Sequence, residues 1–134
     1  MGGRMTSTLT AAEYRAQPKA VELPWPSRDL HPNARCHWAK KARAAKIARS
    51  DAAWWAKAAG MRRIKADALQ VTAIFFPPDR RRRDADGMLS SIKSYLDGIA
   101  DVVGVDDSQW RIAIRRDEPR PGGAVRIEID VDHV

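Results

Sequence analysis

The residues with the clearest chemical potential form two groups that lie close together in the chain. Four consecutive arginines, Arg80 to Arg83, run directly into Asp84, and Asp86 follows one residue later. A second acidic pair, Asp106 and Asp107, lies about twenty residues further on. Arginine attracts phosphate, whereas clustered carboxylates hold a hard divalent cation such as Mg²⁺. Together, the two groups indicate metal-dependent hydrolysis of a nucleic-acid backbone.

The overall charge also favours a polyanionic partner. The chain has 134 residues, a formal net charge of +7 and a pI of about 10.1. Nucleic acid is the commonest partner of such a basic protein. An anionic membrane surface is the competing interpretation, but the basic residues do not share a helix face with a continuous apolar stripe. No apolar run approaches the roughly 20 residues that span a bilayer, and no hydrophobic signal core is evident. We therefore expect a cytoplasmic protein without membrane association.

The single cysteine, Cys36, lies between two histidines, His31 and His37. One cysteine excludes an intrachain disulfide and fits a reducing cytoplasm. A structural zinc site needs about four soft ligands, and no second cluster supplies the remainder. These three residues are therefore interpreted as loop and packing residues.

The elements that must position the charged residues follow from hydrophobic periodicity and turn residues. Expected in chain order are a strand over 21–25, a helix from 36 or 38 to 59, a strand over 68–76, a helix over 86–103, and strands over 110–116 and 125–131. The strand over 110–116 alternates apolar and polar residues, so it should be half-buried, and the last strand should be antiparallel. This order predicts a single α+β domain over residues 19–134, in which a mixed β-sheet is packed against helices. Residues 1–18 are an extension of uncertain order, with a possible short helix around Thr10 to Gln17.

The predicted helix over 86–103 carries one apolar face and one charged face. At about 100° per residue, Asp86, Lys93 and Asp97 fall on the charged face. Lys93 lies a rise of roughly 10 Å beyond Asp86 and can pair with Asp97 one turn further on. A plain alternative is an amphipathic helix with solvated charges and an N-cap at Asp84 or Asp86. The adjacent arginines favour a metal site, because carboxylates beside a bound phosphate are repulsive without a bridging cation.

Two further groups of residues have more than one interpretation. The arginine run is either a phosphate site or a solvated turn, and the basic helix over 38–59 is either a solvated surface or a DNA contact. Four adjacent like charges repel unless an anion binds, which favours the phosphate site for the arginine run. Four of the tryptophans are candidates for a dimer core, the expected role for most of them, or for base stacking. They are Trp38, Trp54, Trp55 and Trp110.

The block from Phe76 to Trp110 resembles the RusA family of Holliday junction resolvases, which phages and prophages often encode. The resemblance rests on Pro-Asp-Arg-Arg-Arg-Arg-Asp-x-Asp, then a helix carrying Lys and Leu-Asp-Gly, then Asp-Asp-Ser-Gln. The segment Leu23 to Pro26 is also similar to the family's N-terminal strand and turn. The resemblance covers roughly residues 22–131, and it implies a RusA-like, dimer-forming fold.

The resemblance also implies an activity and a set of site residues. Members are metal-dependent endodeoxyribonucleases that use Mg²⁺, with Mn²⁺ as a substitute, and resolve Holliday junctions by paired symmetric nicks in DNA recombination and repair. The family's metal-binding aspartates match Asp84, Asp86 and Asp107, with Asp106 as an alternative ligand. The catalytic lysine is best matched by Lys93. In this interpretation Arg80, Arg81, Arg82 and Arg83 bind the DNA backbone.

This chain departs from the family pattern at two places. Gly87 stands where the family commonly has asparagine after the second aspartate, so any hydrogen bond from that amide is absent and the helix start is expected to be looser. The gap from Asp86 to Lys93 is also longer than in the best-known bacterial members.

A four-way junction has approximate two-fold symmetry and needs two matched nicks. One acidic site per chain therefore predicts a homodimer. Two other functions fit the same residues: a nuclease that cuts flaps, forks and other branched DNA, and a non-catalytic DNA-binding module whose acidic residues are only caps and surface charge.

Overall fold

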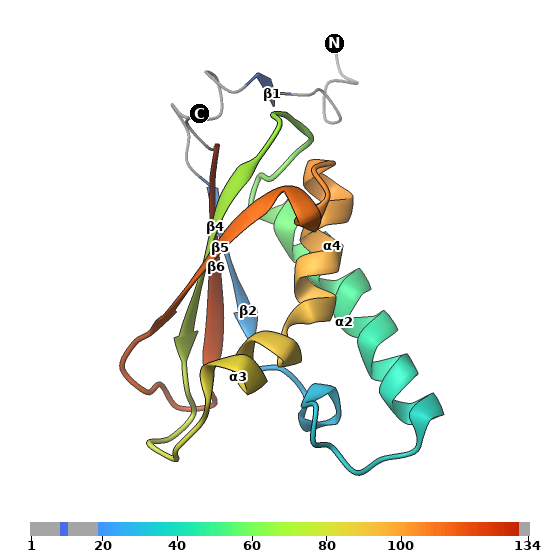
Figure 1. Ribbon diagram of the computed structural model, residues 1–134, viewed down its shortest axis with the longest axis vertical. Coiled ribbons are helices and arrows are strands. Elements are labelled where there is room, and N and C mark those ends of the chain that lie inside the picture. The colour runs from blue at the N-terminus through green and yellow to red at the C-terminus, as the bar shows by residue number, and fades with distance from the viewer. Residues whose placement is uncertain (1–8, 11–18, 132–134) are drawn as a thin grey trace.

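The computed structural model describes residues 9–10 and 19–131 (Figure 1). These residues form a single α+β domain with a mixed four-stranded sheet, as the order of elements predicted. The short helix expected around Thr10 to Gln17 lies outside the described residues, apart from Thr10 itself. Strand β1 (Leu9–Thr10) pairs in parallel with β3 (Ile64–Lys65), so this part of the N-terminal extension contacts the domain.

The main sheet has the strand order β2-β6-β4-β5. Its strands are β2 (Lys19–Pro24), β6 (Ala124–Val131), β4 (Leu69–Phe76) and β5 (Trp110–Arg116). Strand β6 is antiparallel to both β2 and β4, whereas β5 is parallel to β4. The parallel pair needs a crossover, and the chain between these strands supplies it as helices. The antiparallel final strand is thus confirmed.

The helices pack on one side of this sheet, as Figure 1 shows. They are η2 (Arg28–Leu30), α2 (Trp38–Ala58), α3 (Ala85–Ser91), α4 (Lys93–Val103) and η3 (Asp107–Gln109), of which η2 and η3 are single 3₁₀ turns. Alternate residues of the two central strands point to the helices and form the core, because side chains alternate across a strand. The buried residues of this face are Leu69, Val71, Ala73, Phe75, Val125, Ile127, Ile129 and Val131.

Helix α2 lies against α4 through a stripe of small residues. Ala52 and Ala56 are fully buried, and a Cβ on Gly98 of α4 would clash with the carbonyl oxygen of Arg49. The absence of larger side chains lets the two helix backbones approach closely. At the edge of this contact, the Arg49 guanidinium donates to both carboxylate oxygens of Asp101 at 2.7 and 2.8 Å.

The expectation of one continuous helix over 86–103 is wrong. The chain leaves helical geometry at Ile92, with φ −105° and ψ 11°, so that α3 and α4 are separate helices. Next to the break, the Ser91 hydroxyl donates to the Gly87 carbonyl at 2.8 Å, a side-chain bond that competes with helical pairing. The charged face that was to carry both Asp86 and Lys93 is therefore interrupted between them.

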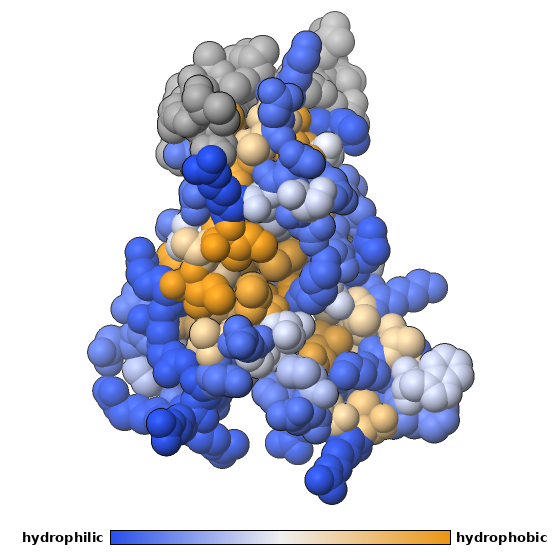
Figure 2. Space-filling model, viewed as in Figure 1, coloured by the Kyte–Doolittle hydropathy of each residue, from blue (hydrophilic) through white to orange (hydrophobic). Residues whose placement is uncertain are grey.

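The expectation that β5 is half-buried is also wrong. Trp110 is buried and donates its indole N–H to the Val105 carbonyl at 2.9 Å, but every later residue of the strand is exposed. Strand β5 is the edge of the sheet, and the helices do not cover it fully. Ile112 and Ile114 remain 39 % and 37 % exposed on its helix-facing side. Figure 2 shows apolar surface over this middle part of the molecule.

The tryptophans divide into two kinds. Trp110 belongs to the core of the domain, so it is available neither for a dimer interface nor for base stacking. Trp38, Trp54 and Trp55 of α2 are exposed. Among the described residues, no helix is both long and apolar enough to cross a bilayer.

Candidate functional site

The four arginines lie in a turn between β4 and α3, residues 77–84, here called the arginine turn. Asp79 organises this turn. Its carboxylate accepts from the Arg81 backbone N–H at 2.9 Å and pairs with the Arg83 guanidinium at 3.0 Å. The Arg81 backbone N–H, followed by the Arg83 side chain, lowers the pKa of Asp79. The carboxylate that holds the turn is therefore ionised at neutral pH.

The four arginines have different roles in this turn. Arg83 is largely buried: it donates to the carbonyl oxygens of Asp79 at 3.3 Å and Arg81 at 3.1 Å, and its guanidinium lies 5.4 Å from the centre of the Trp25 ring. Arg83 thus stabilises the turn. Arg80 is exposed and pairs with Glu118 at 3.2 Å. Arg82 is exposed and has no ion pair with any described residue, so its charge is the most available of the four.

A basic groove of about 870 Å³ runs beside the arginine turn. One wall is the arginine turn with the start of α3, and the other is the loop that carries η2. Trp25 and Phe75 also line it, and they contact each other edge to face with ring centres 6.0 Å apart. Its charged residues are Arg28, Arg35, Arg81, Arg82, Arg83, Asp29, Asp79 and Asp84. Cationic side chains thus outnumber carboxylates in a concave surface that suits an anionic chain.

The opposite wall of the groove was not recognised in the sequence. Arg28, His31 and Arg35 belong to the loop between β2 and α2, far from the arginine turn in the chain. Neither Arg28 nor Arg35 pairs with a described acidic residue. Their spacing forms no motif, and only the fold brings them opposite the arginine turn. The arginines of this loop were the only sequence signal for a binding surface here. The Pro, Asp and Asn content of the segment indicated a loop and nothing more.

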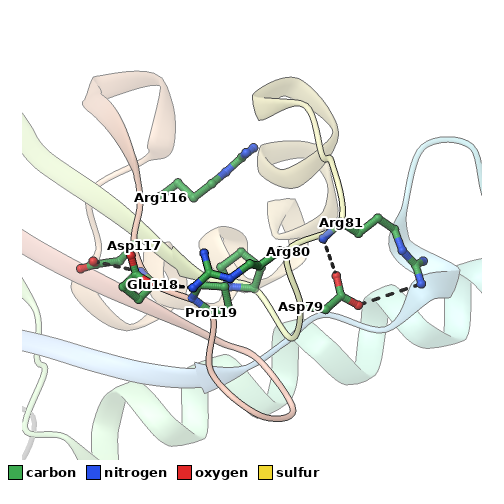
Figure 3. A pocket seen from close by; sticks show the side chains of 8 residues that line it. Asp79, Arg80, Arg81, Arg116, Asp117, Glu118 and Pro119 are labelled. Carbon is green, nitrogen blue, oxygen red and sulfur yellow. Dashed lines mark hydrogen bonds and ion pairs between the residues drawn. The ribbon is translucent and has the colours of Figure 1, made fainter.

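A smaller pocket of about 340 Å³ lies on the other side of the arginine turn (Figure 3). Arg80, Arg81 and Arg116 line it, with Asp117 and Glu118 from the segment after β5. Arg116 donates to the Arg83 carbonyl oxygen, which ties the end of β5 to the turn. Asp79 is the third acidic residue of the lining, so three carboxylates balance three arginines and this pocket attracts an anion less than the basic groove does.

The predicted acidic residues lie in two places, the start of α3 and the turn η3. Asp84 is the N-cap of α3, and its Oδ1 accepts from the Gly87 backbone N–H at 3.1 Å. Asp86 is exposed in the first turn of that helix. Asp107 lies in η3 and accepts from the Lys93 ammonium at 2.5 Å. Asp106 is the N-cap of η3, and the Ser108 hydroxyl, followed by its backbone N–H, lowers the pKa of Asp106.

Lys93 links two acidic residues at the beginning of α4. Its ammonium contacts Asp107 at 2.5 Å and Asp97 at 2.7 Å, so the predicted pair with Asp97 is confirmed. Asp107, followed by Asp97, raises the pKa of Lys93. The lysine therefore neutralises part of the charge that would attract a divalent cation to Asp107.

The carboxylates as placed do not fit a Mg²⁺ site. Among the described residues, no three or more His, Cys, Asp or Glu side chains lie close enough to hold a metal ion. The structure brings Lys93 together with Asp107, but it does not bring Asp107 together with Asp84 and Asp86. The Mg²⁺ requirement stays a prediction.

Comparison with known proteins finds a relative that carries no functional description. No known protein-family profile matches the chain. An uncharacterized protein of Xylella fastidiosa is 41 % identical over 117 residues, which cover 84 % of this chain and 76 % of that protein. Identity at this level over most of both chains indicates common descent and a shared fold. The chain therefore belongs to the same protein family as the uncharacterized Xylella protein.

Proposed function

We propose that this protein is an endodeoxyribonuclease that binds branched DNA and resolves four-way junctions. The observation that carries the proposal is the basic groove, in which arginines from two distant segments face each other beside Asp84. The resemblance of residues 76–110 to the RusA resolvases supplies the activity. The basic groove supports one part of this activity, namely binding of the DNA backbone.

The groove is suited to a sugar-phosphate backbone because its available charges are guanidinium groups. Arginine forms two parallel hydrogen bonds to phosphate and carries its charge at any physiological pH. Arg28, Arg35 and Arg82 are exposed and unpaired with the described carboxylates, so phosphate binding does not require them to break an ion pair. Such contacts give affinity and strong salt dependence but little base-sequence preference.

Hydrolysis of a phosphodiester also requires an activated water and neutralisation of charge on the phosphate. The arginines of the groove would neutralise phosphate charge, and in the resolvases that the chain resembles a divalent metal activates the water. The carboxylates of the described residues do not form a group that could hold a metal ion, so the cleavage assay includes a direct test of metal dependence. Two matched nicks would further require a homodimer, and the exposed tryptophans of α2 are available for such an interface.

A second candidate function is a non-catalytic DNA-binding module. It is favoured by the ion pair between Lys93 and Asp107 and by the capping role of Asp84, because both carboxylates then have structural explanations. In this alternative, the groove binds DNA and no bond is cleaved.

Cleavage assays separate these functions. The purified protein is incubated with a mobile four-way junction, a flap and a linear duplex, each with Mg²⁺, with Mn²⁺ or with chelator. We expect paired nicks in the junction that disappear with chelator. Equal rates on all three substrates would rule out a resolvase. Equal cleavage of junction and flap with little cleavage of the linear duplex would indicate a broader branched-DNA nuclease, and no cleavage with intact binding would favour the non-catalytic module.

Variants of the acidic residues test the same proposal at single side chains. Asp84→Asn and Asp107→Asn should reduce cleavage by at least about a hundredfold while junction binding persists, since charged groups at a reacting phosphate commonly contribute that much. Asparagine is also a good N-cap, so the Asp84 variant should keep α3 intact. Asp101→Asn is the matched control, because its carboxylate pairs with Arg49 away from the groove. Wild-type cleavage rates in both variants would remove these residues from the mechanism.

A further inference from the structure

Gly87, near the start of α3, lies close to side chains from both walls of the basic groove. A Cβ at this position would lie 3.1 Å from the Nε2 of His31 and closer still to the Oδ1 of Asp84. The Nε2 of His31, on one groove wall, and the Oδ1 of Asp84, on the other, therefore both lie near the open side of this glycine. The asparagine expected from the family resemblance would require both side chains to shift.

The orientation of the His31 ring is fixed by the loop that carries it. Its Nδ1 accepts from the Asn33 backbone N–H at 3.1 Å, and its carbonyl oxygen accepts from the Ala34 N–H at 2.9 Å. Because Nδ1 accepts a hydrogen bond, the hydrogen of the neutral ring is on Nε2. The Nε2 makes no hydrogen bond to any described residue. The ring thus has one donor available at the groove that His31 lines.

We propose that His31 binds a phosphate of the nucleic-acid backbone through its Nε2–H, next to Asp84. This inference rests on the proposed function, since it requires the basic groove to bind nucleic acid. A phosphate that approaches Asp84 is repelled by the carboxylate, and a donor between the two anions offsets that repulsion. Arg28 and Arg35 line the groove on the same side as His31 and supply positive charge there. His31 would therefore position the phosphate nearest to the predicted catalytic aspartates.

The two ring nitrogens have separate roles, so two substitutions can separate them. Asparagine at position 31 keeps an acceptor near the position of Nδ1 and removes the donor at Nε2. Glutamine keeps a donor near Nε2 and loses the acceptor at the Nδ1 position. A purely structural role of His31 predicts that His31→Gln is the damaging variant, because it loses the bond to Asn33. Phosphate binding predicts the opposite order.

His37 offers a matched control. Its Nδ1 also accepts from the backbone N–H two residues later, that of Ala39, at 3.1 Å. This histidine does not line the basic groove. His37→Asn therefore repeats the chemical change of His31→Asn in the same local geometry but away from the groove. Arg35→Gln is a second control, which tests whether the groove binds nucleic acid at all.

The measurement is the affinity of each variant for a fluorescently labelled four-way junction at constant salt. We expect His31→Asn to weaken binding about tenfold, as for loss of one hydrogen bond to a charged group. His31→Gln should stay within about threefold of wild type, and His37→Asn should be unchanged. Equal affinity of His31→Asn and wild type, or a weaker His31→Gln than His31→Asn, would overturn the assignment of His31.

The same series distinguishes failure of this inference from failure of the proposed function. If Arg35→Gln weakens binding while His31→Asn does not, the groove binds DNA without help from His31. If neither variant changes the affinity, the basic groove is not the DNA-binding surface, and both proposals are wrong. Thermal unfolding of each variant identifies any loss of binding that follows from a destabilised domain.

Discussion

At the scale of single residues, identical side chains in one run have separate roles. Arg83 is buried against Trp25 and bonds to the backbone of its own turn, whereas Arg82 next to it is exposed and has no ion pair with a described residue. The difference arises because Asp79 and the aromatic ring under the turn select one guanidinium of the four. A run of like charges therefore contains both a residue that stabilises the turn and a residue whose charge remains exposed.

The neighbouring arginines give a matched pair of variants. Arg83→Gln should lower the free energy of unfolding by about 1 to 2 kcal/mol, because it removes hydrogen bonds and a cation–π contact from a largely buried position. Arg82→Gln should leave unfolding unchanged but lower the slope of log affinity for duplex DNA against log salt by about 0.9. Urea denaturation and salt titrations of binding measure the two effects. An unchanged salt slope in Arg82→Gln would contradict a phosphate contact at this residue.

The sequence predicts site residues well where they are neighbours in the chain. An N-cap at Asp84 or Asp86 and the pair of Lys93 with Asp97 were predicted from spacing, since caps and i,i+4 pairs are local, and the structure has the cap at Asp84. Arg28, His31 and Arg35 are placed by tertiary structure, and no local pattern marks them. Whether carboxylates that are distant in the chain come together also depends on the fold. In this structure Asp107 pairs with Lys93, which also pairs with Asp97.

At the scale of elements, the strongly periodic segments were predicted and the interruptions were not. Strands β4 and β6 lie where alternation and β-branched residues predicted them, because the two faces of a central strand have opposite environments. The break at Ile92 is not visible in the apolar pattern, which continues across it. The exposure of β5 depends on its position at the edge of the sheet, which its own alternation does not specify.

The contact between α2 and α4 makes a prediction about acid stability. The Arg49 guanidinium donates to Asp101 and holds the pKa of this carboxyl below its usual range. A group with a lowered pKa in the folded state stabilises the fold above its unfolded pKa of about 3.9, and this contribution is lost as the pH falls through the folded pKa. We therefore expect Asp101→Asn to be less stable than wild type at pH 7, by a small margin because both side chains are half exposed.

The difference between the two proteins should shrink as the pH falls from about 5 towards 2, when wild-type Asp101 also becomes neutral. Asp79 and Asp106 have lowered pKa values as well, but both proteins contain them, so their contribution cancels. Urea midpoints across this pH range measure the effect. A constant difference at every pH would show that Asp101 stabilises the fold through contacts other than its charge.

At the scale of the whole molecule, positive charge and exposed apolar side chains occur together. The chain has a net charge of +7, and both the edge strand β5 and helix α2 retain exposed apolar side chains. The basic groove suits an extended anion, and the exposed apolar side chains suit contact with a second copy of the chain. This combination is the physical basis for expecting two copies to act together.

Sedimentation equilibrium tests that expectation. We expect the mass of a dimer at micromolar protein, and a greater fraction of dimer when four-way junction is added, because one junction offers two equivalent binding sites. Trp54→Ser should shift the equilibrium to the monomer if α2 forms the interface. A monomer mass with and without junction would contradict paired nicking by a symmetric dimer.

The uncovered border of the sheet has one more consequence. Strand β5 carries Arg111 and Arg115 on one side, and no further strand follows it among the described residues. If two copies joined these borders in antiparallel orientation about Ala113, each Arg111 would face an Arg115 of the other copy. Guanidinium groups directly opposite each other disfavour this pairing and so resist growth of the sheet into fibrils. The positive charge that suits the protein to a polyanion thus also protects an otherwise aggregation-prone strand.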